Sequence, residues 1–153
     1  MSGDAPFVSR TPYVAEHPAA LALYCSDGRF TEPVEELLRH VGHARLDTLT
    51  VPGGPGLLNP LTASYGDLDS TKRGASFLIE AHAIRDVFLI AHAGCGYYKK
   101  KLGATKTAEQ IVVVQRKDLE VAAAALERAH PMLRAHMYFA RLADGRVAFD
   151  AVG

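Results

Sequence analysis

The chain has 153 residues, of which 48% are hydrophobic and 22% are charged, and its formal net charge is zero. These values are typical of one globular domain with a substantial core, and they argue against nucleic acid or an anionic membrane as a partner. No apolar stretch approaches the roughly 20 residues needed to cross a bilayer, and the N-terminal residues show no signal-peptide pattern. We therefore expect a cytoplasmic protein whose two cysteines are free or metal-bound rather than bridged.

Residues 1–18 contain three prolines and are expected to form an irregular arm, followed by a single α/β domain over residues 19–153. Hydrophobic periodicity in that domain predicts three helices and five strands. The helices are expected over residues 31–41, 70–84 and 107–129. The strands are expected over residues 21–25, 46–51, 87–91, 137–140 and 147–151.

Local signals set the expected ends of these elements. Thr31 and Ser70 are the expected N-caps of the first two helices, and Gly42 is expected to end the first. Residues 111–114 are β-branched or apolar and leave the start of the third helix open between helix and extended chain. A turn at residues 143–145 predicts that the last two strands form a hairpin.

The alternation of strands and helices predicts a mostly parallel central sheet with helices on both faces and an antiparallel strand at one edge. Cys25 and His92 each lie where a predicted strand ends. Ligands of open α/β sheets bind outside the carboxyl ends of the strands. The two residues are therefore expected to meet if the first and third strands are neighbours.

Each cysteine lies in a short run with metal-binding character, Cys25-Ser26-Asp27-Gly28-Arg29 and His92-Ala93-Gly94-Cys95-Gly96. Two thiolates and an imidazole form a donor set that suits Zn²⁺. Three protein ligands would leave a fourth position open, as in catalytic zinc sites. The competing interpretation is two buried free cysteines, a core histidine and a structural ion pair between Asp27 and Arg29.

The paired motifs Cys25-x-Asp27-x-Arg29 and His92-x-x-Cys95 resemble the signatures of the β-class carbonic anhydrases, and the resemblance extends over about residues 19–152. It implies the fold of that family, a homodimer or higher homo-oligomer, and reversible hydration of CO₂ to bicarbonate. It implies the zinc ligands Cys25, His92 and Cys95. Asp27 and Arg29 would form the catalytic dyad, in which the carboxylate orients a zinc-bound hydroxide and the guanidinium holds the carboxylate.

The resemblance also implies two features of regulation and rate. In some members of the family, the residue matching Asp27 leaves its arginine and closes the site as a fourth zinc ligand. Because two thiolates cancel the formal charge of zinc, the bound water should be less acidic than on a site of three histidines. We therefore expect activity to favour mildly alkaline pH.

Two departures from the family pattern bear on the substrate. Gly28 stands where the family usually has serine, and Val51-Pro52-Gly53-Gly54 stands where it usually has arginine, asparagine, alanine and glycine. We expect the backbone at Gly53, Gly54 and Gly94 to approach a small substrate, although the glycine-rich loop is equally compatible with a plain turn. A hydrolase of carbonyl sulfide or carbon disulfide, and a non-catalytic zinc-binding homologue, therefore remain alternatives.

Other residues near the motifs are expected to be structural. Tyr97 and Tyr98 are expected to pack in the core, and residues 99–101 are expected to form a solvated surface run. A cysteine-dependent phosphatase or sulfurtransferase is disfavoured, because such enzymes place five residues between cysteine and arginine and this chain has three. The histidine that could relay protons to solvent is not identified by the sequence.

Overall fold

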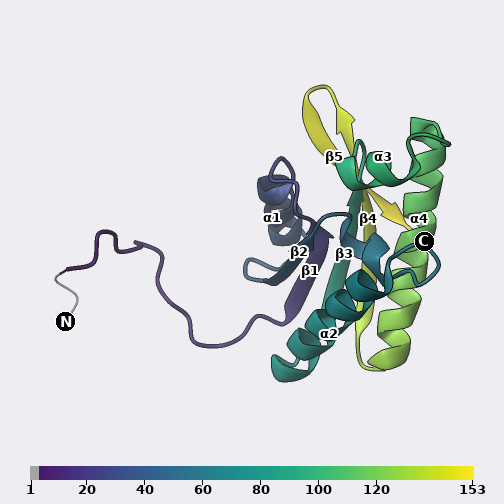
Figure 1. Cartoon of the computed structure of the whole chain (residues 1–153). Helices are drawn as coiled ribbons and strands as arrows, with labels where there is room; N and C mark the ends of the chain where they lie inside the picture. Colours follow the sequence, from purple (N-terminus) through teal and green to yellow (C-terminus); the bar gives the residue numbers. More distant parts are fainter. Residues whose placement is uncertain (1–3) are drawn as a thin grey trace.

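The computed structural model describes residues 4–153 and contains a five-stranded sheet between helical layers (Figure 1). The strands are β1 (Ala20–Cys25), β2 (Asp47–Val51), β3 (Asp86–His92), β4 (Arg134–Ala143) and β5 (Arg146–Val152). The helices are α1 (Thr31–His40), α2 (Tyr65–Ala81), α3 (Gly96–Leu102) and α4 (Ala108–Ala129), with a short 3₁₀ helix η1 (Gly54–Leu58).

The strand order is β2-β1-β3-β4-β5, and the first four of these strands are mutually parallel. β5 is antiparallel to β4 and forms one edge of the sheet. The predicted fold class, a mostly parallel sheet with an antiparallel edge strand, is therefore confirmed. β1 and β3 are neighbours, with Tyr24 opposite Ile90, so the strand ends at Cys25 and His92 lie at the same edge of the sheet.

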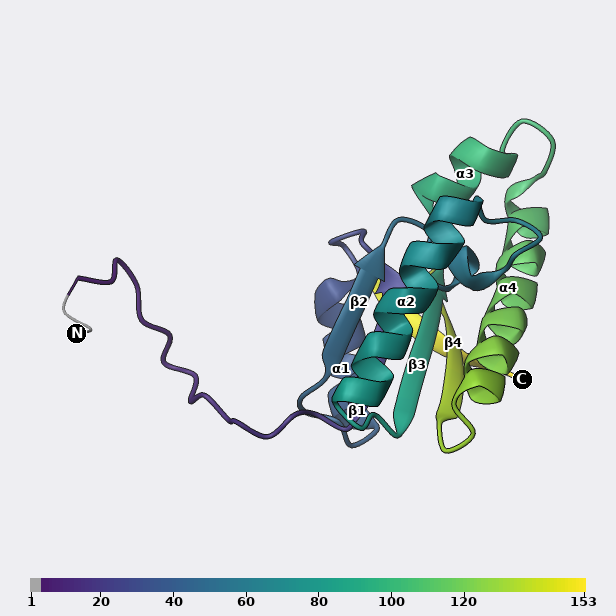
Figure 2. The ribbon, with the colours of Figure 1, turned by 60° about the horizontal axis from the view of Figure 1, so that its bottom comes forward.

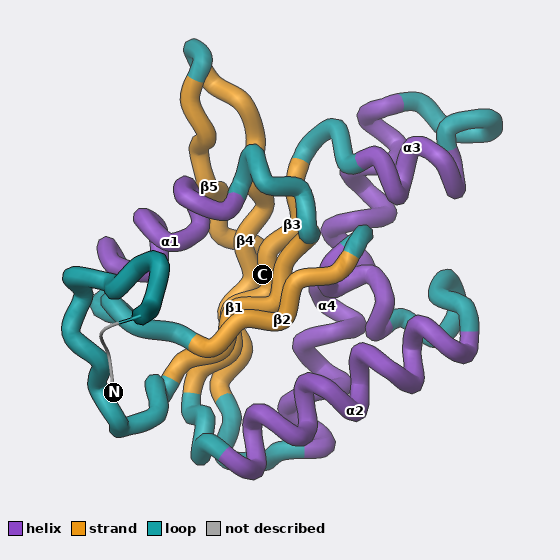
Figure 3. The backbone as a smooth tube through the Cα atoms, turned by 60° about the vertical axis from the view of Figure 1, so that its left-hand side comes forward, coloured by secondary structure: helices purple, strands orange, loops and turns teal. Residues whose placement is uncertain are grey.

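Helices cover both faces of the sheet, as seen when the sheet is viewed nearly edge-on (Figure 3). Side chains alternate between the faces along each strand. Leu21 and Leu23 of β1 pack with α2 and α4, whereas Ala20 and Ala22 pack with α1. Both faces of β1 and β3 are buried, which explains why their sequences are continuous apolar runs.

Two expected helix caps are wrong. Ser64 rather than Ser70 caps α2, because its hydroxyl accepts a hydrogen bond from the Asp67 N–H at 3.3 Å. The intervening turn lacks an apolar stripe, which conceals the true start. In α1, Thr31 is the first helical residue, and Phe30 occupies the cap position without a side-chain hydrogen bond.

The structure also settles the start of α4 and adds a helix that the sequence analysis did not predict. Thr107 and Gln110 form a reciprocal capping box, so residues 111–114 are helical despite their β-branched side chains. The unpredicted helix is α3, whose seven residues include the run Lys99-Lys100-Lys101. A helix this short has no amphipathic period long enough to detect in the sequence.

Residues 4–19 contain no helix or strand and lead away from the sheet (Figures 1 and 2). The expected arm falls within this segment, except that residues 1–3 lie outside the described residues. The segment meets the domain where the ring of His17 stacks on His82, with centroids 3.8 Å apart. Within the described part of the chain, no helix has the length and apolar character needed to span a membrane.

Candidate metal centre

Cys25, His92 and Cys95 meet at the carboxyl edge of the sheet. Cys25 ends β1, His92 ends β3, and Cys95 is the N-cap of α3. The two Sγ atoms are 3.9 Å apart, and one ligand atom from each of the three residues lies within 4.8 Å of the others. All three residues are buried. The structure therefore brings the predicted ligands together, in a geometry that one metal ion could bridge.

Hydrogen bonding orients the His92 imidazole. Nδ1 lies 2.9 Å from the carbonyl oxygen of Ala93, and since a carbonyl only accepts, Nδ1 carries the hydrogen. Nε2 is buried and has no hydrogen-bond partner among residues 4–153. An unpartnered buried nitrogen is costly unless it serves as a ligand. Two thiols and this free imidazole lone pair fit a zinc ion.

Neighbouring groups hold the His92 ring and its strand end in place. The Phe30 ring packs against the imidazole, with centroids 4.2 Å apart. The buried Gln115 of α4 donates from Nε2 to the His92 carbonyl oxygen at 2.9 Å. The Phe30 ring thus fixes the imidazole of His92, and Gln115 fixes its backbone.

The two thiols lie within hydrogen-bonding distance, with their Sγ atoms 3.9 Å apart. The Cys95 thiol donates to Cys25 Sγ, which lowers the pKa of Cys25, and the resulting thiolate raises the pKa of Cys95. Backbone N–H groups of Gly53 and Asp27 also favour the Cys25 thiolate. Burial disfavours a charged imidazole, but the adjacent Cys25 thiolate raises the pKa of His92 overall. The pocket is thus arranged to hold negative sulfur, the form that binds metal.

Asp27 and Arg29 lie beside the cluster as an ion pair. Arg29 Nη2 donates to Asp27 Oδ2 at 2.6 Å, Nε donates to Oδ1 at 3.0 Å, and the Arg29 backbone N–H donates to Oδ1 at 3.1 Å. These bonds, chiefly the one from the guanidinium, lower the pKa of Asp27 to about 2. Asp27 is not part of the cluster of candidate ligands.

The three glycines predicted to contact substrate differ in their surroundings. Gly53 has φ +86° and faces the Tyr97 ring, while Gly54 has φ +54° and would place a Cβ 2.9 Å from the Cys25 nitrogen. The loop therefore packs tightly against the end of β1, a constraint that only glycine satisfies. Gly94 has φ +70° and is exposed between the two ligands of the second motif. Substrate contact by these three residues remains a prediction.

A cavity of about 370 Å³ adjoins the second motif. Ala93, Gly94 and Cys95 line one part of it, and Ile111, Val112 and Gln115 of α4 line another. Lys99, Lys106 and Glu109 supply its charged groups. The space beside the candidate ligands is thus bounded largely by apolar side chains.

A family model described as "Putative carbonic anhydrase" matches residues 15–129, which include the whole candidate centre. The chain belongs to this family. The predicted resemblance to carbonic anhydrases is therefore confirmed. No curated protein sequence gave a significant match.

Solved β-carbonic anhydrases share the fold of this carbonic anhydrase family member. The β-carbonic anhydrase CcaA aligns with a TM-score of 0.59 and 18% identity over 90% of this chain and 78% of its own. A tetrameric β-carbonic anhydrase from Sordaria macrospora aligns with a TM-score of 0.56 and 13% identity, covering 90% and 84%. Carbonic anhydrase from Glaciozyma antarctica aligns with a TM-score of 0.55 and 15% identity, covering 88% and 82%. At such identities the likeness establishes the fold.

The sequence analysis of this family member missed several buried polar residues behind the ligands. They are Asn59, Gln115 and Asp118, each at most 4% exposed. Gln115 and Asp118 occupy positions of α4 whose neighbours along the same face, Ile111 and Leu119, are core residues. A polar residue at an apolar position of a helix is the signal that could have identified them.

Proposed function

We propose that this chain is a zinc lyase that interconverts CO₂ and bicarbonate, with Cys25, His92 and Cys95 as the zinc ligands. The observation that carries the proposal is the buried, unpartnered Nε2 of His92, within 4.8 Å of two thiols and beside a paired aspartate. When bound, zinc would act as a Lewis acid that makes water a competent nucleophile near neutral pH. Membership of the carbonic anhydrase family supports this chemistry.

In this proposal, the Asp27 carboxylate accepts a hydrogen bond from the attacking water and so aims an oxygen lone pair at the carbon of CO₂. Arg29 keeps the carboxylate ionised, and its contacts through both the guanidinium and the backbone limit rotation of Asp27. A carboxylate with a pKa of about 2 stays an acceptor throughout the neutral range. Asp27 therefore orients the nucleophile rather than removing its proton.

CO₂ carries no charge, so its binding site requires shape and an apolar wall more than fixed charges. The cavity beside Cys95 and the exposed backbone at Gly94 provide such a surface. Gly53 and Gly54 present backbone close to Cys25, where a small linear molecule could approach. We propose these three glycines as the substrate-facing backbone.

Carbonyl sulfide and carbon disulfide are linear triatomic molecules like CO₂, and hydrolysis of either is the second candidate function. The absence of polar side chains from the loop over residues 51–54 favours a less polar substrate. A non-catalytic zinc protein is the third candidate. The pairing of Asp27 with Arg29 supports a catalytic site over this candidate. Among residues 4–153, three candidate ligands cluster without Asp27, so a fourth coordination position would stay open.

We further propose a cytoplasmic homodimer or higher homo-oligomer. Two observations support an assembly: one related fold is described as tetrameric, and Phe7 and Tyr13 of the arm are more than four-fifths exposed. Exposed large apolar side chains are typical of surfaces that contact another protein. Sedimentation velocity would show an assembly larger than the 16.5 kDa chain, whereas a monomer at micromolar concentration would contradict the proposal.

The proposal is tested by stopped-flow CO₂ hydration with zinc-loaded protein, with Asp27→Ala measured alongside. The expected result is turnover that depends on zinc and falls by about 100-fold or more in the variant, since an orienting interaction of this kind typically contributes factors of 10²–10⁴. Zinc content should be unchanged by Asp27→Ala. No turnover by stoichiometrically loaded protein would refute the lyase, and parallel assays of carbonyl sulfide and carbon disulfide would then decide between the remaining functions.

A further inference from the structure

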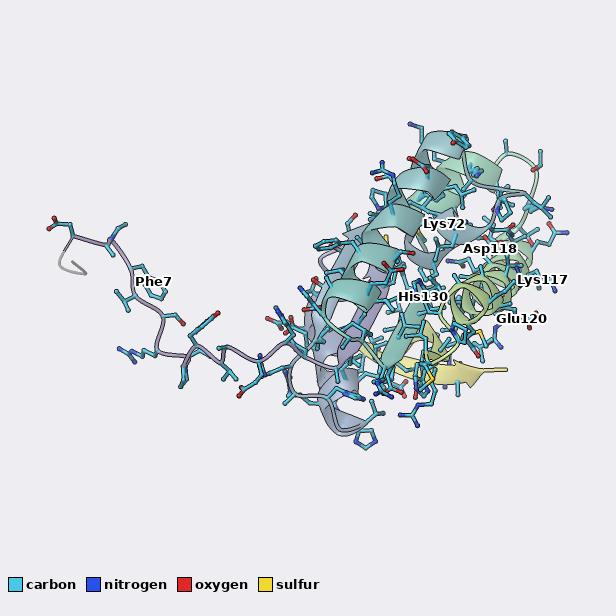
Figure 4. All side chains as sticks on the ribbon, turned by 90° about the horizontal axis from the view of Figure 1, so that it is seen from below. Phe7, Lys72, Lys117, Asp118, Glu120 and His130 are labelled. Atoms are coloured by element: carbon cyan, nitrogen blue, oxygen red, sulfur yellow. The ribbon has the colours of Figure 1, made fainter. Side chains whose placement is uncertain are left out.

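A buried carboxylate lies behind the candidate metal centre and has no part in the proposed chemistry. Asp118 of α4 is 2% exposed. Figure 4 shows it on the inward side of α4, whereas Lys117 and Glu120 point toward solvent. Its two oxygens accept hydrogen bonds from Tyr98 Oη at 2.6 Å and from Asn59 Nδ2 at 2.7 Å. Isolated carboxylates are costly to bury, so this one must be offset by a specific gain.

The orientation of the Asn59 amide is fixed by a second contact. Its Oδ1 accepts a hydrogen bond from the Leu61 N–H at 3.0 Å, which leaves Nδ2 to donate to Asp118. Both partners of Asp118 are therefore donors, as an ionised carboxylate requires. The Asp118 carboxylate thus joins α4, the end of η1 and α3 by two short hydrogen bonds.

The contact with Tyr98 leads directly to one candidate ligand. Tyr98 lies in the first turn of α3, for which Cys95 is the N-cap, and its ring packs against both cysteines. Cys95 makes no side-chain cap hydrogen bond of its own, so its position depends on the placement of α3. A fixed Tyr98 hydroxyl sets the rotation of α3 and therefore the position of Cys95 at the start of this helix.

The contact with Asn59 leads to the other candidate sulfur ligand. Asn59 is the C-cap of η1, and Gly53 is its N-cap. Gly54, the first residue of η1, lies against the Cys25 backbone, where an added Cβ would come 2.9 Å from the Cys25 nitrogen. Anchoring the end of η1 therefore fixes the loop that surrounds Cys25.

We propose that Asp118 is a positioning residue that fixes the placement of both sulfur ligands, Cys95 through Tyr98 and Cys25 through Asn59. The inference rests on the proposed zinc site but requires no particular substrate. Residues that contact metal ligands from behind orient those ligands, and loss of such a residue typically weakens metal binding by about 10- to 100-fold. Because one carboxylate would position both cysteines, a change at Asp118 should alter the placement of both sulfur ligands together.

The test compares Tyr98→Phe and Asp118→Asn with the parent chain, using two readouts of the metal site that do not depend on turnover. The first is zinc affinity, measured by competition with a chelator. The second is the absorption spectrum after loading with Co²⁺, whose thiolate charge-transfer and ligand-field bands report ligand geometry. We expect about 10- to 100-fold weaker zinc binding and shifted Co²⁺ bands in both variants. The double variant should lose no more than the stronger single variant, because both changes break the same link.

Tyr138→Phe is the matched control, because Tyr138 lies on β4 and packs on the opposite face of the sheet, toward α1. It should leave affinity and spectrum unchanged. A lower melting temperature in Tyr98→Phe with parental affinity and spectrum would overturn the proposal, because it would show a purely structural role. Tyr98→Phe keeps the packed ring, so it decides the question if Asp118→Asn does not fold. A parent that binds metal but does not hydrate CO₂ would refute only the proposed function, while a parent that binds no metal would refute the zinc site itself.

Discussion

Replacing Gly56 with alanine should destabilise the fold through a single steric conflict. Gly56 lies within η1, is buried, and does not have a positive φ, so its backbone conformation suits alanine. The added Cβ, however, would overlap the hydroxyl of Tyr98 and lie 3.3 Å from Asp118 Oδ2. The substitution therefore tests whether η1 and α3 are packed as tightly as the structure indicates.

The expected cost has two parts. Forcing one extra carbon into a packed interior costs about 1–3 kcal/mol. Displacing the Tyr98 hydroxyl breaks its 2.6 Å hydrogen bond to Asp118 and leaves a buried carboxylate short of a donor, which costs about 1–3 kcal/mol more. The free energy of unfolding should therefore fall by about 2–6 kcal/mol, which corresponds to a melting temperature lower by about 5–20 °C for a chain of this length.

Urea denaturation followed by circular dichroism would measure this change, with Gly74→Ala as the matched control. Gly74 lies inside α2, and an added Cβ there would make an ordinary 3.6 Å contact with Leu49. Alanine is favoured over glycine in a helix interior, so Gly74→Ala should be stabilised by about 0.5–1 kcal/mol. If Gly56→Ala were as stable as the parent, the packing of η1 against Tyr98 would be refuted.

Three further outcomes follow from the site and the sheet. Cys95→Ala should lose stoichiometric zinc, measured by elemental analysis after dialysis, and near-parental zinc content would contradict its role as a ligand. CO₂ hydration should rise from neutral to mildly alkaline pH, because two thiolates neutralise more of the metal charge than imidazoles do; a rate already at its plateau in acid would oppose this. Burial disfavours the Asp86 carboxylate, but hydrogen bonds from His136 and Arg134 lower its pKa overall. The stabilisation by this cluster should therefore be complete above the ordinary aspartate pKa of about 4 and be lost as the pH falls toward the lowered pKa of Asp86 in the folded protein. If the melting temperature of Asp86→Asn depended on acid pH in the same way as that of the parent, this prediction would be refuted.

The sheet could be predicted from the sequence because its central strands are buried on both faces. Residues 21–25 and 87–91 are short, continuous apolar runs, a pattern that few other structures produce. Helix starts were harder to predict, because a cap is one polar residue among many. Ser64 and Ser70 are equally good caps by residue type, and in the structure Ser64 is the one whose side chain accepts the capping hydrogen bond.

The candidate metal ligands could be predicted for a different reason. The ends of neighbouring parallel strands bring residues that are distant in the sequence to the same edge of the sheet. Cys25 and His92 needed only the correct order of β1 and β3 to meet. Asp118 could not be found in this way, because its partners come from η1 and α3, a 3₁₀ turn and a helix too short to show periodicity. Contacts between irregular segments depend on tertiary packing that no local pattern records.

The proposed metal ligands and the proposed catalytic pair differ in how firmly the surrounding chain holds them. The candidate ligands are buried, and Gln115 and the Phe30 ring hold His92 in place among them. The Arg29 side chain, by contrast, is 73% exposed and fixes Asp27 mainly through direct hydrogen bonds. Exposed ion pairs are weak and easily exchanged, whereas buried ligand frames are not. Changes to the Asp27–Arg29 pair should therefore alter turnover without releasing metal, and changes behind the sulfur ligands should alter metal affinity first.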